Sequence, residues 1–290
     1  MPSFSRHLAA HVVFLAAAFL GVAACGRSGP EKSDPEIFTW SGALKAPASV
    51  NLRNINGTID VKPSADDSVR VSAAARWHRG NPKTDLKFDV VNAEGSITIC
   101  VLWTKGTCSS SEYTTQPNFL SKFLKQRGTD ARVTLTVFVP ARVKVDVLTM
   151  NGDLHVAATA PVKAHTLNGA IQVATAVGPV EAESMNGSVD VRMTTLGEDG
   201  PVRAITINGS VSAYLPEQLN AAVSLAAVNG RVGSDFPISM EGVSNASRHL
   251  DGMVGAGGRE VKVSTVNGSA WLHRLSADGT PIEGPASTKP

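Results

Sequence analysis

Cys25 carries the most definite chemistry in the sequence, because it closes a leader that ends in Val22-Ala23-Ala24-Cys25-Gly26. Before it lie a short basic start and an uncharged run of 13 residues from Val12 to Ala24. A membrane-spanning helix needs about 20 apolar residues, so residues 1–25 are predicted to be a cleaved signal peptide. The junction has the pattern of a lipobox, with Val22 where Leu is usual, and predicts acylation of the Cys25 thiol. The alternatives are ordinary cleavage after Ala24 and no processing.

A lipid on Cys25 would make a membrane the first partner of the chain and place it in the bacterial cell envelope. Gly26 favours the outer membrane over the inner one, because lipoproteins kept at the inner membrane often carry Asp there. Residues 26–36 are rich in Gly, Pro, Ser and charge and are predicted to be a flexible tether. Residues 37–275 then form the folded domain, and residues 276–290 a disordered tail.

Cys100 and Cys108 are the other two cysteines. An odd number of cysteines in an exported chain leaves one thiol unexplained, and acylation of Cys25 removes that oddity. In an oxidising compartment the remaining pair is predicted to form a disulfide that closes a small loop. Two free thiols or a metal pair are the alternatives, although two cysteines without a nearby histidine make a poor zinc site.

No catalytic or metal-binding motif stands out among the remaining polar residues. His155 and His165 fall on outward strand positions without a partner at metal-ligand spacing. Cleavage of a glycosidic bond would need two carboxylates about 5–9 Å apart. The outward carboxylates are Asp153, Glu183 and Asp190. Asp190 could lie near Gln172 and His155, but solvated strand surface is the simpler interpretation. The sequence therefore predicts no enzyme, no metal and no cofactor, and a net charge of +2 without a basic stripe predicts no nucleic-acid partner.

These side chains are positioned by an internal repeat that the dipeptide Asn-Gly marks. Gly accepts a positive φ and Asn tolerates it best of the other residues, so each copy predicts a sharp turn. The central copies are 17, 18, 22 and 21 residues apart. The dipeptide begins at Asn56, Asn151, Asn168, Asn186, Asn208, Asn229 and Asn267.

Apolar residues recur at fixed distances from each of these asparagines. A valine stands six residues before each Asn, and apolar residues stand four before it, directly before it and three after it. The valines are Val50, Val145, Val162, Val180, Val202, Val223 and Val261. Alternating apolar positions indicate half-buried strands on both sides of the turn. Two short strands and two turns in each unit of about 17–22 residues predict an all-β fold, a β-solenoid.

An antiparallel meander of Asn-Gly hairpins is the alternative, because hairpin pairing would bury the same positions. The residues five before Asn separate the two folds. In the central units they are Asp146, Lys163, Glu181 and Arg203. In a solenoid these outward side chains stack about 4.8 Å apart and the alternating signs attract, whereas in a meander they need not meet. The pattern favours the solenoid, in which the asparagines must form a ladder along one edge.

Residues 117–127 are the best candidate for a helix. Asn118 can cap it, and Phe119, Leu120, Phe123 and Leu124 would form one apolar stripe. The helix would lie over a solenoid end or over the disulfide loop. Contact with a membrane or a partner is the alternative.

The repeat supports a family resemblance. The run from Val133 to Val147, and Thr149-Met150-Asn151-Gly152 with its later copies, resemble the bacterial putative-adhesin family of domains of unknown function. Gly255-Ala256-Gly257-Gly258 is similar to the ending of that family. The resemblance covers roughly residues 45–275 and implies a β-solenoid surface domain, often on a lipoprotein or behind a membrane anchor, with no catalytic residues to carry over. The 38 residues before Asn267 depart from the regular period.

The residues and the resemblance leave two classes of function. The first is a binding or adhesion module whose ribbed face recognises an envelope glycan or protein. The second is a structural or stress-sensing accessory protein of the envelope with no ligand of its own. An exposed row of aromatic side chains would favour the first class. The sequence has only 15 aromatic residues, and its four tryptophans, Trp40, Trp77, Trp103 and Trp271, fall in different segments.

Overall fold

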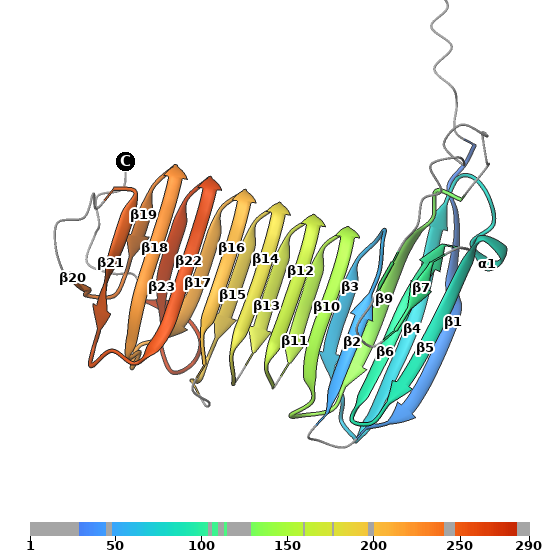
Figure 1. Ribbon diagram of the computed structural model, residues 1–290, viewed down its shortest axis with the longest axis horizontal. Helices are drawn as coiled ribbons and strands as arrows, with labels where there is room; N and C mark the ends of the chain where they lie inside the picture. Colours follow the sequence, from blue (N-terminus) through green and yellow to red (C-terminus); the bar gives the residue numbers. More distant parts are fainter. Residues whose placement is uncertain are drawn as a thin grey trace, which may run out of the picture.

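Two long β-sheets face each other along the molecule (Figure 1). Through most of its length the chain passes alternately from one sheet to the other. The computed structural model describes residues 29–44, 48–103, 106–109, 113–114, 129–158, 160–175, 177–196, 200–240 and 247–282. Cys25 and the helix expected over 117–127 lie outside the described residues.

We name the two sheets A and B. Sheet A has the strand order β1-β4-β9-β3-β11-β13-β15-β17-β23-β19, with β24 beside β23. Its strands are β1 (Lys32–Ala43), β3 (Ile59–Pro63), β4 (Ser68–Trp77), β9 (Arg132–Val139), β11 (Leu154–Ala158), β13 (Ile171–Thr175), β15 (Val189–Met193), β17 (Val211–Pro216), β19 (Val232–Ser234), β23 (Ala270–Leu275) and β24 (Pro281–Ile282).

Sheet B has the order β20-β21-β18-β22-β16-β14-β12-β10-β2-β6-β5. Its strands are β2 (Ser49–Arg53), β5 (Leu86–Ala93), β6 (Ser96–Trp103), β10 (Lys144–Asn151), β12 (Val162–Asn168), β14 (Val180–Asn186), β16 (Val202–Asn208), β18 (Ala221–Asn229), β20 (Ser239–Met240), β21 (His249–Val254) and β22 (Arg259–Asn267). A separate small sheet pairs β7 (Thr107–Cys108) with β8 (Tyr113–Thr114), and the described residues include one short helix, α1 (Pro82–Asp85).

The strand pairing confirms the solenoid and shows that the hairpin meander is wrong. β14 and β15 flank Asn186-Gly187, but β14 lies in sheet B and β15 in sheet A, so the turn joins the two sheets. Each of the two strands pairs in parallel with the equivalent strands of the neighbouring coils. Val180 stands opposite Val162 and Val202, so the repeat units stack without a change of register.

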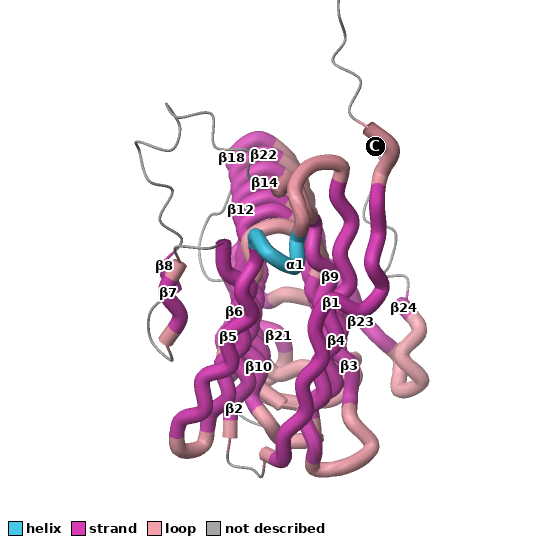
Figure 2. The backbone as a smooth tube through the Cα atoms, turned by 90° about the vertical axis from the view of Figure 1, so that its right-hand side faces the viewer, coloured by secondary structure: helices cyan, strands magenta, loops and turns pink. Residues whose placement is uncertain are grey.

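The core lies between the two sheets, which Figure 2 shows from the end of the molecule. The seven valines six residues before Asn are at most 3% exposed. The residues three after Asn face them from sheet A and are similarly buried, with Ile59, Leu154, Ile171, Val189 and Val211 at 0%. The side-chain alternation of a strand therefore separates one buried face from one outward face in each sheet.

The last coil, β22–β23, is not at the end of the stack. β22 lies between β16 and β18, and β23 lies between β17 and β19 (Figure 1). The 38-residue interval before Asn267 reflects this path. The chain first forms the outer coil β18–β19, continues through β20 and β21, and then returns to fill the gap.

Antiparallel strands extend the sheets beyond the coils. β4 pairs with β1 and β9 in sheet A, and β5 pairs with β6 in sheet B. At the other end β21 pairs antiparallel with β18. β1 begins at Lys32, so part of the segment expected as a tether (26–36) is a strand, and β24 lies in the segment expected as a tail (276–290). Cys100 of β6 and Cys108 of β7 form a disulfide, with Cα atoms 6.2 Å apart.

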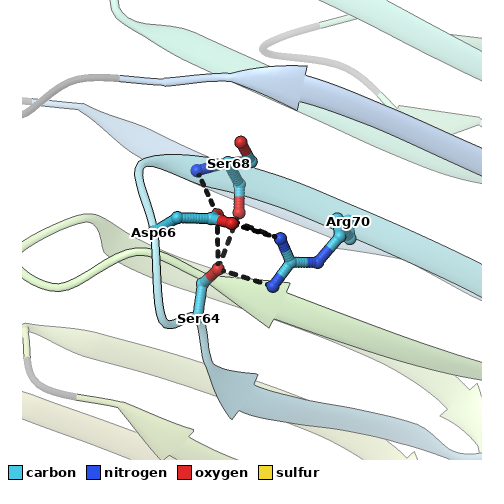
Figure 3. Close-up of polar contacts among 4 residues, drawn as sticks. All are labelled: Ser64, Asp66, Ser68 and Arg70. Atoms are coloured by element: carbon cyan, nitrogen blue, oxygen red, sulfur yellow. Dashed lines mark hydrogen bonds and ion pairs between the residues drawn. The ribbon is translucent and has the colours of Figure 1, made fainter.

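The turn between β3 and β4 is fixed by a cluster of polar side chains (Figure 3). The Asp66 carboxylate accepts hydrogen bonds from the backbone N–H of Ser68 at 3.0 Å and from Arg70 Nη1 at 2.7 Å. Arg70 Nη2 also donates to Ser64 Oγ at 3.1 Å. The hydrogen bond from Arg70 is the main reason that the pKa of Asp66 lies below its usual value. Every member of the cluster therefore has a structural partner within the turn.

A column of buried hydroxyl groups, two residues before Asn, also joins the coils. Thr206 Oγ1 donates to the carbonyl oxygen of Gly187 at 2.8 Å, and Ser184 Oγ donates to that of Gly169 at 2.9 Å. Thr166 and Thr265 make the same bond to Gly152 and Gly209. These hydroxyls provide a donor to half-buried carbonyl groups at the turns.

Replacing Thr206 with valine should lower the free energy of unfolding by about 1 kcal/mol, because the isosteric side chain removes the hydrogen bond to the half-buried Gly187 carbonyl. Thr206 is 1% exposed, so the valine methyl group that replaces the hydroxyl keeps water from the position of the lost donor. Urea unfolding followed by circular dichroism measures the change. Thr206→Ser keeps the hydroxyl and is the control. An unchanged free energy of unfolding in Thr206→Val would show that the hydrogen bond does not matter.

Candidate binding site

A pocket of about 490 Å³ lies on the outward face of sheet A. Its residues come from five strands, β3, β11, β13, β15 and β17, which are consecutive in the sheet order. The side chains that line it are Asp60, Lys62, His155, Ala157, Gln172, Ala174, Asp190, Arg192 and Tyr214, together with backbone at Val61, Val156 and Val173. Its volume is in the range of pockets that hold small ligands.

Two small side chains create the hollow. The outward positions six residues after Asn are, in stacking order, Lys62, Ala157, Ala174, Arg192 and Tyr214. Ala157 stands opposite Ala174, and Ala174 stands opposite Arg192. The alanine side chains end close to the sheet, whereas Lys62 and Arg192 extend from it, so the alanines form a floor between two longer cationic side chains.

A polar row runs beside this floor, at the positions four residues after Asn. In stacking order it contains Asp60, His155, Gln172 and Asp190, each opposite the next. His155 Nδ1 lies 2.7 Å from Asp60 Oδ1. Burial raises the pKa of Asp190, while a hydrogen bond from Ser212 and the positive charges of Arg192 and His273 partly oppose that rise. The row therefore offers carboxylate, imidazole and amide groups along one line.

A stack of planar side chains forms one wall of the pocket. The Arg192 guanidinium lies 4.6 Å from the centre of the Tyr214 ring, and the Tyr214 ring stacks on His273 at 4.7 Å. His273 Nδ1 is 2.9 Å from Asp235 Oδ2, which fixes the orientation of its ring. Because both faces of Tyr214 are covered, the ring supports Arg192 in place instead of offering a free platform.

Trp271 extends the stack beyond the pocket. Its ring lies parallel to His273, with 5.9 Å between centres, and covers Gly233 of β19. A side chain at Gly233 would occupy the position of the indole ring. Three rings of sheet A, those of Tyr214, His273 and Trp271, thus form one continuous half-buried row, although Tyr214 lies far in the sequence from the other two.

The carboxylates of the polar row are too far apart for glycosidic cleavage by an acid and a base. Asp60 and Asp190 are three strands apart, which corresponds to about 14 Å at the usual spacing of strands. A pair of catalytic carboxylates in a glycosidase is about 5–9 Å apart. Glu183 faces outward from sheet B, on the other side of the molecule from Asp190. Across the described ranges, no group of three or more His, Cys, Asp or Glu side chains could hold a metal ion.

The asparagines predicted as repeat turns lie along one edge of the solenoid. Their side-chain amides form a ladder in which each Nδ2 donates to the Oδ1 of a neighbouring coil at 2.6–2.8 Å. The order of the ladder is Asn151, Asn168, Asn186, Asn208, Asn267 and Asn229. Asn56 lies beside Asn151 but donates to the carbonyl of Ala131 at 2.9 Å. Every rung thus has a partner within the protein, so the ladder is a structural element.

The charged column five residues before Asn has the expected register, and the expected contact between Lys163 and Glu181 is confirmed, whereas Asp146 and Arg203 pair with residues outside the column. Lys163 and Glu181 stand opposite each other, with Nζ 3.1 Å from Oε2. Arg203 stands opposite Glu181 but also opposite Lys262, and its guanidinium pairs with Glu260 at 3.0 Å. Such exposed pairs contribute at most about 1 kcal/mol each.

The pocket residues Asp60, Lys62, Arg192 and Tyr214 were not predicted from the sequence. The alignment on Asn-Gly contained the signal, because the columns four and six residues after Asn contain most of the pocket. The residues six after Asn are, in stacking order, Lys, Ala, Ala, Arg and Tyr. Because small side chains stand between large ones along this stack, the sequence pattern indicates a hollow. His155, Gln172 and Asp190 were expected to lie near one another, and the structure places them in adjacent strands.

Comparison with known proteins gives a family match. The Toastrack DUF4097 family model matches residues 49–271. No curated protein matches the chain. In the portion of the chain that the structure describes, no helix has the length and apolar character needed to cross a membrane.

Two solved structures are similar to the chain. One is described as a putative cell adhesion protein from Clostridium sporogenes; it is 9% identical, with 82% of this chain and 99% of that chain covered and a TM-score of 0.35. The other is described as a putative adhesin from Bacteroides fragilis; it is 11% identical, with 84% and 97% covered and a TM-score of 0.37.

Proposed function

Because the chain belongs to the Toastrack DUF4097 family, we propose that it is a non-catalytic binding module of the bacterial cell envelope, which presents the outward face of sheet A to an envelope glycan or protein. The observation that carries this proposal is the pocket on sheet A. It combines a hollow of about 490 Å³ with polar side chains that are already held in position by neighbouring residues. Preorganised groups lose little conformational entropy when a ligand binds, which favours binding.

A lipid anchor is the second part of the proposal. Acylation of Cys25 attaches the N-terminus to a membrane, with the outer membrane favoured by Gly26. Only the few residues between Cys25 and Lys32, where β1 begins, then separate the lipid from the folded domain. The anchor therefore holds the end of the solenoid that carries β1 close to the membrane.

Replacing Cys25 with serine should move the protein from the membrane fraction to the soluble fraction, or leave the leader uncleaved, because serine has no thiol to acylate. Cell fractionation and mass measurement of the intact protein check this result. Ser28→Ala, outside the junction, is the control and should stay membrane-bound. A Cys25→Ser protein that is processed and membrane-bound like the unchanged chain would contradict the anchor.

The binding function is tested with the Cys25→Ser chain on washed fragments of the cell envelope, so that the lipid does not itself retain the protein. Ala174→Trp fills the pocket from an exposed outward position and should reduce retention on the fragments about tenfold, since a bulky side chain on the floor excludes a ligand. Ala222→Trp adds the same side chain at an exposed position of sheet B and should retain the original binding. Equal retention of the two variants would favour a structural role without a ligand on this face.

A further inference from the structure

The pocket on sheet A presents both an apolar surface and paired polar groups. Its floor consists of the methyl groups of Ala157 and Ala174. Along one side runs the polar row, in which Gln172 lies between His155 and Asp190. A ligand that fits must therefore have a nearly flat apolar face and polar groups along its edge.

Each end of the pocket pairs a cation with a carboxylate on the same strand. Asp60 and Lys62 point outward from β3, and Asp190 and Arg192 point outward from β15. The two carboxylates and two cations balance, so the pocket has no net attraction for an anion or a cation. A hydrogen-bond acceptor and a donor side by side match a pair of hydroxyl groups, each of which can both donate and accept.

The distance between the two ends suits an extended ligand. Asp60 and Asp190 are separated by about 14 Å, and the polar row offers a further group at each strand between them. A single sugar ring would reach only part of this row. An oligosaccharide lying across the strands would reach both ends.

The polar groups at both ends are fixed before any ligand arrives. At one end, Asp60 orients the His155 ring through the 2.7 Å contact. At the other end, Arg192 lies against Tyr214 and donates to the carbonyl oxygen of Gly279 at 3.3 Å. Such fixed positions allow hydroxyl groups to be recognised at low entropic cost.

We propose that this pocket binds an uncharged oligosaccharide, whose C–H faces lie on Ala157 and Ala174 and whose hydroxyl groups bond to Asp60, Gln172, Asp190 and Arg192. This inference rests on the proposed binding function and specifies its ligand class. The net neutrality of the pocket argues against an acidic glycan, because a carboxylate of the ligand would meet Asp60 or Asp190 as readily as a cation.

The test measures binding of the full chain by titration calorimetry to three neutral probes: a β-1,4-linked N-acetylglucosamine oligomer, a cello-oligosaccharide and a malto-oligosaccharide. Oligogalacturonate is the acidic comparison. We expect binding of at least one neutral probe, little changed between low and high salt, because no net charge is neutralised. Gln172→Ala should weaken that binding about tenfold, and Ala174→Trp should abolish it. Ala222→Trp is the control and should bind normally.

Two results would overturn the inference. One is binding of oligogalacturonate that falls with salt and that exceeds binding of every neutral probe. The other is failure of all three neutral probes. If envelope fragments still bind in a way that Ala174→Trp disrupts, only the ligand class is wrong and the proposed function stands. If that retention is also insensitive to Ala174→Trp, the proposed function fails as well.

Discussion

Replacing Gly187 with alanine should lower the free energy of unfolding by about 4 kcal/mol or more and leave little folded protein at growth temperature. The added Cβ would lie closer than 3.0 Å to the backbone carbonyl of Gly169 in the neighbouring coil. Neither backbone can move away, because Gly187 N–H bonds to the Asn208 carbonyl and Gly169 N–H bonds to the Asn186 carbonyl, each at 2.8 Å. Thermal unfolding followed by circular dichroism measures the loss.

Gly258→Ala separates the effect of close approach from that of backbone conformation. Gly258 has a φ of +114°, yet nothing lies within 4 Å of the position its Cβ would take. Its replacement should cost only the conformational strain, about 1–2 kcal/mol. If Gly187→Ala were no more damaging than Gly258→Ala, the close approach of the coils would not be the reason for glycine at this position.

Close approach of the coils also accounts for glycine in all seven copies of the repeat. Five of the seven glycines have a positive φ, but Gly152 and Gly230 do not. All seven have a backbone atom of a neighbouring strand where a Cβ would lie. The close spacing of the stacked coils therefore requires glycine at all seven positions, whereas the backbone conformation of the turn requires it at only five.

Ending the chain after Gly258 should leave a protein that aggregates or is digested from β18 onward by a protease. This truncation removes β22 and β23, and with them four ladders of backbone hydrogen bonds to neighbouring strands. It also removes Val261, Val263 and Leu272, which are 0% exposed and each contribute about 1.5–3 kcal/mol by burial. The outer coil β18–β19 then has no neighbour on the inner side.

Ending the chain after Ile282 is the matched control, because it keeps every described strand. This shorter chain should unfold at the same temperature as the full protein and resist the protease equally. Limited proteolysis and size-exclusion chromatography compare the two truncations. A chain ending at Gly258 that is monomeric and resistant through β21 would show that the outer coil does not depend on β22–β23.

The sequence predicted the coils well, because the spacing of residues around each Asn-Gly is the same as the register in which the strands pair. Once seven copies are aligned on Asn-Gly, the buried valines and the ladder asparagines are obtained by counting from each Asn. The contacts of the charged column could not be predicted from register alone. Arg203 pairs with Glu260, which is not one of the residues five before Asn. The buried hydroxyls at Thr206 and its equivalents were missed because polar residues were not expected on an inward position.

The place of the last coil could not be predicted in the same way. Every coil presents the same columns, so a coil from any part of the chain fits against any other. The 38 residues before Asn267 indicated an irregularity without showing that Asn267 bonds to Asn208, 59 residues away. The pocket was difficult for a related reason, since its residues become neighbours only when five different coils are stacked.

The interior position of β22–β23 has a consequence for the order in which the coils can stack. Residues 259–275 follow the outer coil β18–β19 in the chain, yet the coil that they form lies between coils made by earlier residues. Stacking can proceed along the chain only as far as β17, and β18–β19 has no inner neighbour until residues 259–275 take their place. The fold is therefore closed by insertion of a coil and not by addition of one at its end.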